Sequence, residues 1–535
     1  MNTLNVTELR AHPHRWWAFV ALSFSLLVIG LDNTVLNVAL PTMARDLGAT
    51  ESQLQWIVDA YTLVFAGLLL TMGSLGDRFG RRKALIAGLS IFGLGSIWAA
   101  FSGSANILIA ARAVMGIGGA LIMPTTLSIT MNIFEGKERG RAIGAWAGVA
   151  GLSIIIGPVF GGWLLNHYSW GVIFLINVPI IALVLLGTSF LVPESKDPDA
   201  SKLDPIGALL SIAGLTALLW GIIEVPVNGW SDSRIIAAFI IAAVLLLAFV
   251  IWELRSRSPM LNMKLFRNPR FSAASLAITL NTFSMFGALF ILTQYLQFIL
   301  GYTPLQAGTA LIALIPTLLI GSILSPRIVE RIGTKIPVTI GLVIVAGAFV
   351  LLSTASASSG YGLVALMLAI LGLGFGLTMA PATTSIMGAL PLGRAGVGSA
   401  VNDTTRQVGG ALGVAVLGSI LASVYRSSLN SASIMQLLPP PVREIVRDSI
   451  GRAAFVASHI GGQAGQMLTS AVNTAFIDAM HNTVLISAGV TLCGALVALL
   501  FLPAYAKDEQ NAQDNLTQDG VATTMEVQEE EQLKA

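Results

Sequence analysis

The sequence predicts an all-α integral membrane protein with fourteen transmembrane helices, and three observations support that prediction. Of the 535 residues, 55% are hydrophobic and only 11% are charged, with a mean hydropathy of +0.78. A soluble domain carries about 25% charged residues, so a water-soluble core could not hide this much apolar surface. The other two observations are a series of apolar runs of membrane-spanning length and the uneven distribution of basic residues between those runs.

The apolar runs define the expected helices. A membrane-spanning helix needs about 20 mostly apolar residues. Such runs lie at 16–40, 54–74, 83–101, 106–131, 141–165, 172–192, 205–223, 234–252, 272–298, 305–324, 336–354, 361–388, 396–424 and 481–503. The Gly-rich stretch at 116–128 resembles the one at 374–385. This similarity predicts two six-helix bundles built from parallel halves, with the seventh and eighth helices inserted between them, and such halves are typical of transporters.

The chain is expected to divide into five parts. These are a cytoplasmic N-terminus at 1–15, an N-terminal six-helix bundle at 16–192, a linker with two transmembrane helices at 193–271, a C-terminal six-helix bundle at 272–503, and an acidic disordered tail at 504–535. The C-terminal bundle includes a long outer loop at 425–480. Apolar residues recur there at helical spacing after residues 439–441, all proline, which predicts an amphipathic helix over the mouth of the bundle.

Basic residues predict the orientation in the membrane. With the N-terminus inside, 22 of the 30 lysines and arginines fall on the cytoplasmic side, six fall outside and two fall within spans. Loops rich in lysine and arginine stay in the cytoplasm. Both termini are therefore expected to be cytoplasmic, in a multi-pass protein of the plasma membrane.

Several classes of function are excluded by composition and motif. A net charge of +2 indicates no nucleic-acid partner, and the single cysteine, Cys493, excludes an internal disulfide. The five histidines show no metal-ligand spacing, and the sequence has no phosphate-binding loop and no nucleophile–base arrangement. We therefore expect neither an enzyme nor a bound metal or cofactor. Energy would have to come from an ion gradient, and a monomer in the lipid bilayer is expected.

The first candidate site residue is Asp32, in the first span. A charge inside a span costs a few kcal/mol or more, so it is a functional candidate by default. Asn33 and Asn37 extend the polar surface beside it, on neighbouring turns. The alternative is a helix-end residue wetted by the outer solution, and the amides favour the functional interpretation.

The second candidate is Asp59, in the second span. Trp56 and Thr62 lie three residues to either side and share its helix face. Tyr61 adds a second aromatic side chain nearby. A carboxylate beside an aromatic ring suits an amphipathic cation, because charge pairing and ring stacking act together. The alternative is an interfacial tryptophan next to a wetted acid.

Two arginines also fall within spans. Arg112 enters the fourth span at a depth where it could pair with either aspartate, and an unpaired arginine there would be expensive. Its alternative role is a side chain that reaches to the membrane surface. Arg406 lies three residues after Asp403 in the thirteenth span, so these two side chains are a candidate ion pair serving structure, gating or coupling.

One stretch, Gly73–Leu85, concentrates glycines and charges between the second and third spans. Its candidate gating residues are listed in order: Gly73, Asp77, Arg78, Gly80 and Arg81. Any short cytoplasmic loop can be glycine- and arginine-rich, but the order of residues here is more specific. It resembles the loop between helices 2 and 3 that marks the major facilitator superfamily of transporters.

Three further motifs resemble the fourteen-helix drug:proton antiporter branch of that superfamily, of EmrB/QacA type, and the resemblance covers about residues 14–505. They are Asp32–Pro41, Arg112–Ala120, and a fifth-span motif consisting of Gly157, Pro158, Gly161 and Gly162. Proline bends a span and glycines allow close helix contact. Ser153 departs from the pattern, which prefers glycine there.

The resemblance implies a function and residue roles. It implies multidrug efflux, with antibiotic resistance, in which protons are exchanged for amphipathic, cationic compounds. Asp32 and Asp59 would exchange proton and drug, and Arg112 would tune them. The Gly73–Leu85 and fifth-span residues would control gating. Asp77 would face the cytoplasmic N-terminus of the thirteenth span, near Gly393–Arg394, whose helix dipole favours an acid.

Other functions compete with this one. The same fold could export a metabolite, a lipid precursor or a tetracycline-like compound, which substrate profiling would separate. Uptake by symport is a second alternative, decided by the direction of proton flux. A non-transporting receptor or scaffold is a third, and it would tolerate neutral replacement of Asp32 and Asp59.

Overall fold

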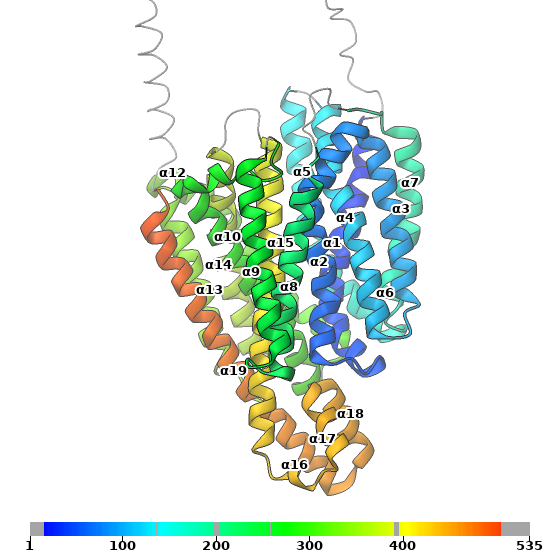
Figure 1. Ribbon diagram of the computed structural model, residues 1–535, viewed down its shortest axis with the longest axis vertical. Coiled ribbons are helices and arrows are strands. Elements are labelled where there is room, and N and C mark those ends of the chain that lie inside the picture. Colours follow the sequence, from blue (N-terminus) through cyan, green and yellow to red (C-terminus); the bar gives the residue numbers. More distant parts are fainter. Residues whose placement is uncertain (1–14, 135, 197–202, 257, 390–394, 504–535) are drawn as a thin grey trace, which may run out of the picture.

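The computed structural model describes residues 15–134, 136–196, 203–256, 258–389 and 395–503, and it is helical throughout this part of the chain (Figure 1). The first half of the chain forms one bundle. Its helices are α1 (Arg15–Asp46), α2 (Glu51–Phe79), α3 (Arg81–Ala100), α4 (Ala105–Ile133), α5 (Gly136–His167), α6 (Val172–Leu175) and α7 (Asn177–Leu191). Helices α6 and α7 together make the sixth span.

The second half forms a bundle beside the first. It contains η2 (Met263–Arg267), α10 (Pro269–Gln294), η3 (Tyr295–Ile299), α11 (Pro304–Ala310), η4 (Leu311–Ala313), α12 (Leu314–Ile332), α13 (Lys335–Leu352), α14 (Tyr361–Gly388), α15 (Ala395–Asn430), α16 (Ile434–Leu437), α17 (Pro440–Asp448), α18 (Ile450–Ile460) and α19 (Gly462–Phe501). The inserted pair is α8 (Pro205–Asn228) and α9 (Ser233–Arg255). Helix α8 packs against both α2 and α15, so the insert covers one side of the boundary between the bundles.

The predicted fourteen-helix fold is confirmed. Within the described residues, thirteen helices or joined helix segments are long and apolar enough to cross a membrane. Helix α5, at 32 residues, occupies the predicted place of the fifth span. The two six-helix bundles and the inserted pair therefore follow the predicted order. The predicted acidic tail and all but the last residue of the predicted N-terminal segment lie outside the described residues.

Close glycine packing relates the two halves. A Cβ on Gly118 would lie 2.7 Å from the Gly88 carbonyl oxygen of α3, and one on Gly374 would lie 2.6 Å from the Gly341 carbonyl oxygen of α13. The α3–α4 contact of the first half thus reappears as the α13–α14 contact of the second. The equivalent glycines are 256 residues apart. Gly116 therefore corresponds to Gly372 rather than to Gly374, a two-residue shift from the register expected from sequence.

The two ends of the molecule differ (Figure 1). We call the end that carries α16–α18 the cap end, and the opposite end, where the described chain begins and finishes, the terminal end. The printed side-chain hydrogen bonds between the halves gather at the cap end. They include Gln297 Nε2 to the Val38 carbonyl oxygen at 2.8 Å and Gln294 Nε2 to Glu51 Oε1 at 2.9 Å.

The segment expected as a loop at 425–480 is mostly helical, which corrects the predicted ends of two spans. Helix α15 continues to Asn430, and α19 begins at Gly462 rather than at 481. The extension of α19 is stabilised by packing against α18, so it does not need a bilayer around it. The predicted amphipathic helix after residues 439–441 is present as α17, followed by α18. Ser449, between them, donates a hydrogen bond to the Ala49 carbonyl oxygen at 3.3 Å and so ties this cap to the first half.

Candidate functional site

Asp32 and Arg112 form a buried ion pair inside the first bundle. Their side chains are each 1% exposed, and Arg112 Nη1 contacts Asp32 Oδ2. The guanidinium also donates from Nε to the Ile57 carbonyl oxygen at 3.1 Å. Its carbon lies 4.4 Å from the centre of the Tyr61 ring. The pair therefore joins α1, α2 and α4, and each partner offsets the cost of burying the other.

Asp59 has a different environment, although it lies on the same helix as Ile57 and Tyr61. Its residue is 0% exposed, and neither carboxylate oxygen has a hydrogen-bond partner among the described residues. Ile57 and Tyr61 face Arg112, whereas residues two positions away on a helix point to nearly the opposite side. Gln55, one turn before Asp59, lies against Gly418 of α15. Asp59 therefore lies on the face of α2 that turns towards the second half, and not beside Arg112.

An isolated buried carboxylate has limited options. Removing a charged group from water without a partner is very costly, and a proton or a bound cation removes that cost. Asp59 thus has the environment of a group that exchanges between those two partners. Asp32 does not, because Arg112 already neutralises it.

The remaining cavity candidates spread around these two acids. Asn37 donates from Nδ2 to the Asn33 carbonyl oxygen at 3.2 Å, and its Oδ1 is buried without a partner among the described residues. Thr62 donates back to the Val58 carbonyl oxygen at 3.1 Å. Trp56 packs on an apolar cluster that joins α2, α8 and α15. Asn33 and Asn37 thus extend from Asp32, while Trp56 lies towards the second half, near the insert.

The glycines of the fifth-span motif permit close contacts on two sides of α5. Gly157 and Gly161 face Thr34 and Val35 of α1, and a Cβ at either position would collide with those side chains. A Cβ on Gly162 would lie 2.5 Å from the Pro304 carbonyl oxygen of α11. Pro158 lies in the same contact, against Gly308. The motif therefore lies where α5 touches the other half.

The Gly73–Leu85 stretch contains a tight turn between α2 and α3 at the terminal end. Gly80 has φ of 118° there, a conformation that side chains rarely adopt. Asp77 Oδ1 accepts hydrogen bonds from Arg81 Nε at 2.8 Å and from Ser128 Oγ at 3.4 Å. Arg78 lies over the ring of Phe79, 5.7 Å from its centre, and Gly73 packs against Pro124. The partner expected for Asp77, near Gly393–Arg394, lies outside the described residues.

Asp403 and Arg406 lie 3.8 Å apart on α15, at the limit of an ion pair, with the arginine side chain 42% exposed. This pair is therefore much more open than Asp32–Arg112. Exposed pairs of this kind contribute about 0–1 kcal/mol.

Comparison with known proteins adds the family. The family model of the Major Facilitator Superfamily matches residues 22–414. The chain belongs to this superfamily. Among curated relatives, it is 34% identical to the multidrug efflux pump LfrA of Mycolicibacterium smegmatis, over 91% of this chain and 96% of that protein. It is 33% identical to the tetracenomycin C resistance and export protein of Streptomyces glaucescens, over 92% of each.

A solved structure of the Major Facilitator Superfamily fold gives the same architecture. A bacterial homolog of the human lysosomal transporter Spinster, in an inward-facing and unoccupied conformation, superposes with a TM-score of 0.64 at 17% identity, covering 92% of this chain and 98% of that one. Another relative, the methyl viologen resistance protein SmvA of Salmonella typhimurium, is 31% identical over 92% of this chain and 99% of that protein.

Sequence reasoning missed several residues of this Major Facilitator Superfamily chain. Glu194 Oε1 accepts the backbone N–H of Arg82 at 3.1 Å, and the Ser195 carbonyl oxygen accepts that of Arg81 at 2.9 Å. The segment after α7 thus holds the start of α3, and no local pattern signals it. Gln55 and Glu51 were also missed, although they precede Asp59 by four and eight residues on one helix face.

Proposed function

We propose that this transporter exports amphipathic cations across the plasma membrane in exchange for protons, with both termini in the cytoplasm and the cap end outside. The observation that carries the proposal is Asp59, buried between the halves with both oxygens free of partners among the described residues. Relatives named for resistance to drugs, including the dication methyl viologen, support export of such compounds.

The exchange follows from the position of Asp59. A protonated Asp59 is neutral and needs no partner in the buried interface. An arriving cation supplies the positive charge that lets the proton leave, and release of the cation to the outside lets a new proton bind. Trp56, one turn away, offers a ring face for the apolar part of the cation. The Asp32–Arg112 pair tunes the exchange by holding α1, α2 and α4 in register around it.

The stoichiometry of this scheme determines the driving force. One proton exchanged for one monovalent cation moves no net charge, so the membrane potential does no work on it. The pH difference then supplies about 1.4 kcal/mol per unit, which is tenfold in concentration. Exchange of a proton for a neutral solute would add about 2.3 kcal/mol per 100 mV.

Ethidium efflux from energised cells tests the function. We expect protonophore-sensitive efflux by the wild type and its loss in Asp59→Asn, while Asp478→Asn, an exposed acid on α19, exports normally. Nigericin, which collapses the pH difference, should stop efflux more completely than valinomycin, which collapses the potential. A well-expressed wild type that exports no ethidium would contradict the proposal.

The chief alternative keeps the fold and changes the cargo. The relative named for tetracenomycin C export favours a neutral aromatic substrate or a tetracycline-like one. A panel of neutral and cationic compounds separates the two, because only export of cations should depend on the charge of Asp59.

A further inference from the structure

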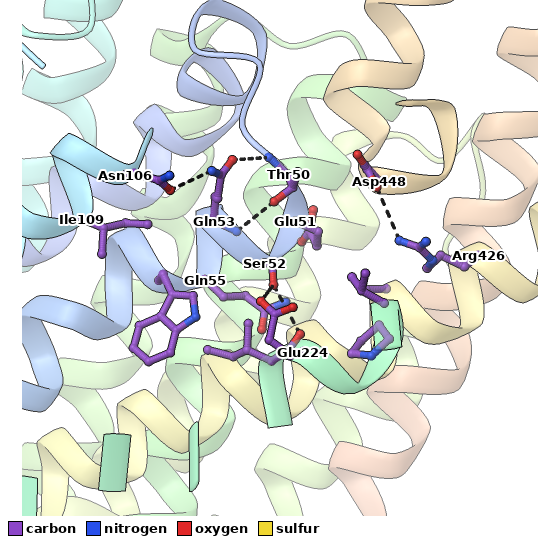
Figure 2. A pocket seen from close by; sticks show the side chains of 15 residues that line it. Thr50, Glu51, Ser52, Gln53, Gln55, Asn106, Ile109, Glu224, Arg426 and Asp448 are labelled. Atoms are coloured by element: carbon purple, nitrogen blue, oxygen red, sulfur yellow. Dashed lines mark hydrogen bonds and ion pairs between the residues drawn. The ribbon is translucent and has the colours of Figure 1, made fainter. Parts of the chain in front are cut away.

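A cavity of about 460 Å³ opens at the cap end, above the buried interface that holds Asp59 (Figure 2). Helices α2, α4, α8, α15 and α17 all contribute to its lining. The residues used below are Glu51, Gln55, Trp56, Glu224, Arg426 and Asp448. The volume falls within the range of about 300–1,000 Å³ typical of small-molecule sites. One wall comes from α8, a helix of the inserted pair.

The cavity carries an excess of negative charge. Three carboxylates line it, Glu51, Glu224 and Asp448, together with one basic side chain, Arg426. Arg426 is engaged by Asp448 at 3.5 Å and by Glu444 at 3.6 Å. Burial raises the pKa of Asp448, and the nearby guanidinium groups of Arg452 and Arg426 oppose that rise. Asp448 is therefore already paired with basic groups, which leaves the other two carboxylates to set the character of the cavity.

Glu51 and Glu224 have polar but uncharged partners. Glu51 is 6% exposed and accepts a hydrogen bond from Gln294, while Glu224 accepts from Ser52 Oγ at 2.8 Å and from Asn228 Nδ2 at 3.2 Å. Among the described residues, neither carboxylate has a basic group within ion-pair distance. Figure 2 shows Ser52, Gln55 and Glu224 close together at the cavity wall.

Gln55 links this cavity to Asp59. Its side chain is fully buried, and its Nε2 has no hydrogen-bond partner among the described residues. Glu51, Gln55 and Asp59 follow one another at four-residue spacing on one face of α2. With a rise of 1.5 Å per residue, this polar face spans about 12 Å between the cavity and the buried acid.

We propose that the cavity is a second binding site for the exported cation, occupied after the cation leaves Asp59 and before it reaches the outer solution. This inference rests on the proposed export function. Glu224 and Glu51 supply the charge, Trp56 supplies the ring face, and the unpartnered Gln55 amide lies between the two sites. The inserted helix α8 thereby takes a direct part in binding through Glu224.

Cysteine protection tests the site. In a Cys493→Ser background, Val227→Cys places a thiol at the cavity wall, where Val227 is 51% exposed. Ser358→Cys places a matched control on an exposed loop of the second half, outside the cavity. The purified full chain in lipid nanodiscs is labelled with a maleimide at increasing ethidium concentration. We expect ethidium to slow labelling of Val227→Cys at least fivefold and to leave Ser358→Cys unchanged.

Two further substitutions separate direct occupancy from coupling through the central acid. With Val227→Cys, Glu224→Gln should raise the half-protecting ethidium concentration about tenfold, whereas Asp478→Asn should leave it unchanged. Protection should persist in Asp59→Asn, because the cavity binds the cation independently. Loss of protection in Asp59→Asn would overturn the proposal, since it would show that a change of conformation caused the effect.

The outcome also separates this inference from the export function. If the wild type exports ethidium but Val227→Cys is not protected, the second site is wrong and export stands. If the wild type neither exports nor binds ethidium, the proposed export function fails and the second site fails with it. If Glu224→Gln does not reach the membrane, protection of Val227→Cys in the presence and absence of Asp59→Asn decides the question alone.

Discussion

Two aspartates on neighbouring helices, Asp32 and Asp59, are both buried, but their surroundings differ. Asp32 lies within the first bundle and pairs with Arg112. Asp59 lies on the face of α2 that turns to the second bundle and has no hydrogen-bond partner among the described residues. The first acid is fixed by its partner, whereas the second is available to one that comes and goes. Burial alone therefore does not define a coupling residue, and the missing partner is the more informative feature.

Breaking the Asp32–Arg112 pair should have the largest effect on stability. Arg112→Gln leaves a buried carboxylate without its cation, which costs about 3–5 kcal/mol. We expect the melting temperature of the purified protein to fall by several degrees and efflux to be lost. The double variant Asp32→Asn/Arg112→Gln should recover most of the stability without recovering efflux.

The open pair on α15 provides the matched control for that change. Arg406→Gln makes the same substitution in a pair whose arginine side chain is 42% exposed and 3.8 Å from its partner. Exposed pairs contribute about 0–1 kcal/mol, so the melting temperature should hardly move. Equal losses in Arg112→Gln and Arg406→Gln would contradict the importance of the buried pair.

Neutral replacement of each acid in turn sharpens the comparison. Asp59→Asn removes no described hydrogen bond, so its melting temperature should match or exceed that of the wild type while efflux falls at least twentyfold. Asp32→Asn leaves Arg112 charged and buried, so it should lose stability as well as efflux. Thermal melts and ethidium efflux on the same preparations measure both quantities. A destabilised Asp59→Asn would show that this acid has a structural partner.

The smallest stability effect is expected at Asp77, the acid of the turn between α2 and α3. Its side chain is 33% exposed, and asparagine retains an oxygen that can accept from Arg81. Asp77→Asn should therefore change stability by less than about 1 kcal/mol. The family resemblance nevertheless predicts that turnover stops, because the turn acts in gating. Normal efflux by Asp77→Asn, at normal abundance in the membrane, would remove that role.

The sequence was sufficient to find the helices and the buried charges, because both stand out chemically. Long apolar runs have one stable arrangement in a bilayer, and Asp32, Asp59 and Arg112 are conspicuous within them. It was not sufficient to decide which acid pairs with Arg112. That choice depends on the rotation of α2, which places Ile57 and Tyr61 towards α4 and Asp59 on the other side.

The cap end was the least predictable region. Residues 462–480 are too polar to read as a membrane span, yet they extend α19 because α18 packs along them. The cavity there combines residues from five helices, and no local pattern brings Glu224 to Glu51. The four-residue spacing of Glu51, Gln55 and Asp59 was a usable signal, but a glutamine draws less notice in a sequence than a charge does.

Proton release on binding tests the central claim most directly. Ethidium is added to the purified full chain in weakly buffered solution near pH 7, and a pH indicator reports protons released while fluorescence reports binding. We predict release approaching one proton per bound cation from the wild type and from Asp478→Asn, and almost none from Asp59→Asn at matched occupancy. Equal release from the wild type and Asp59→Asn would contradict the claim that Asp59 exchanges its proton for the cation.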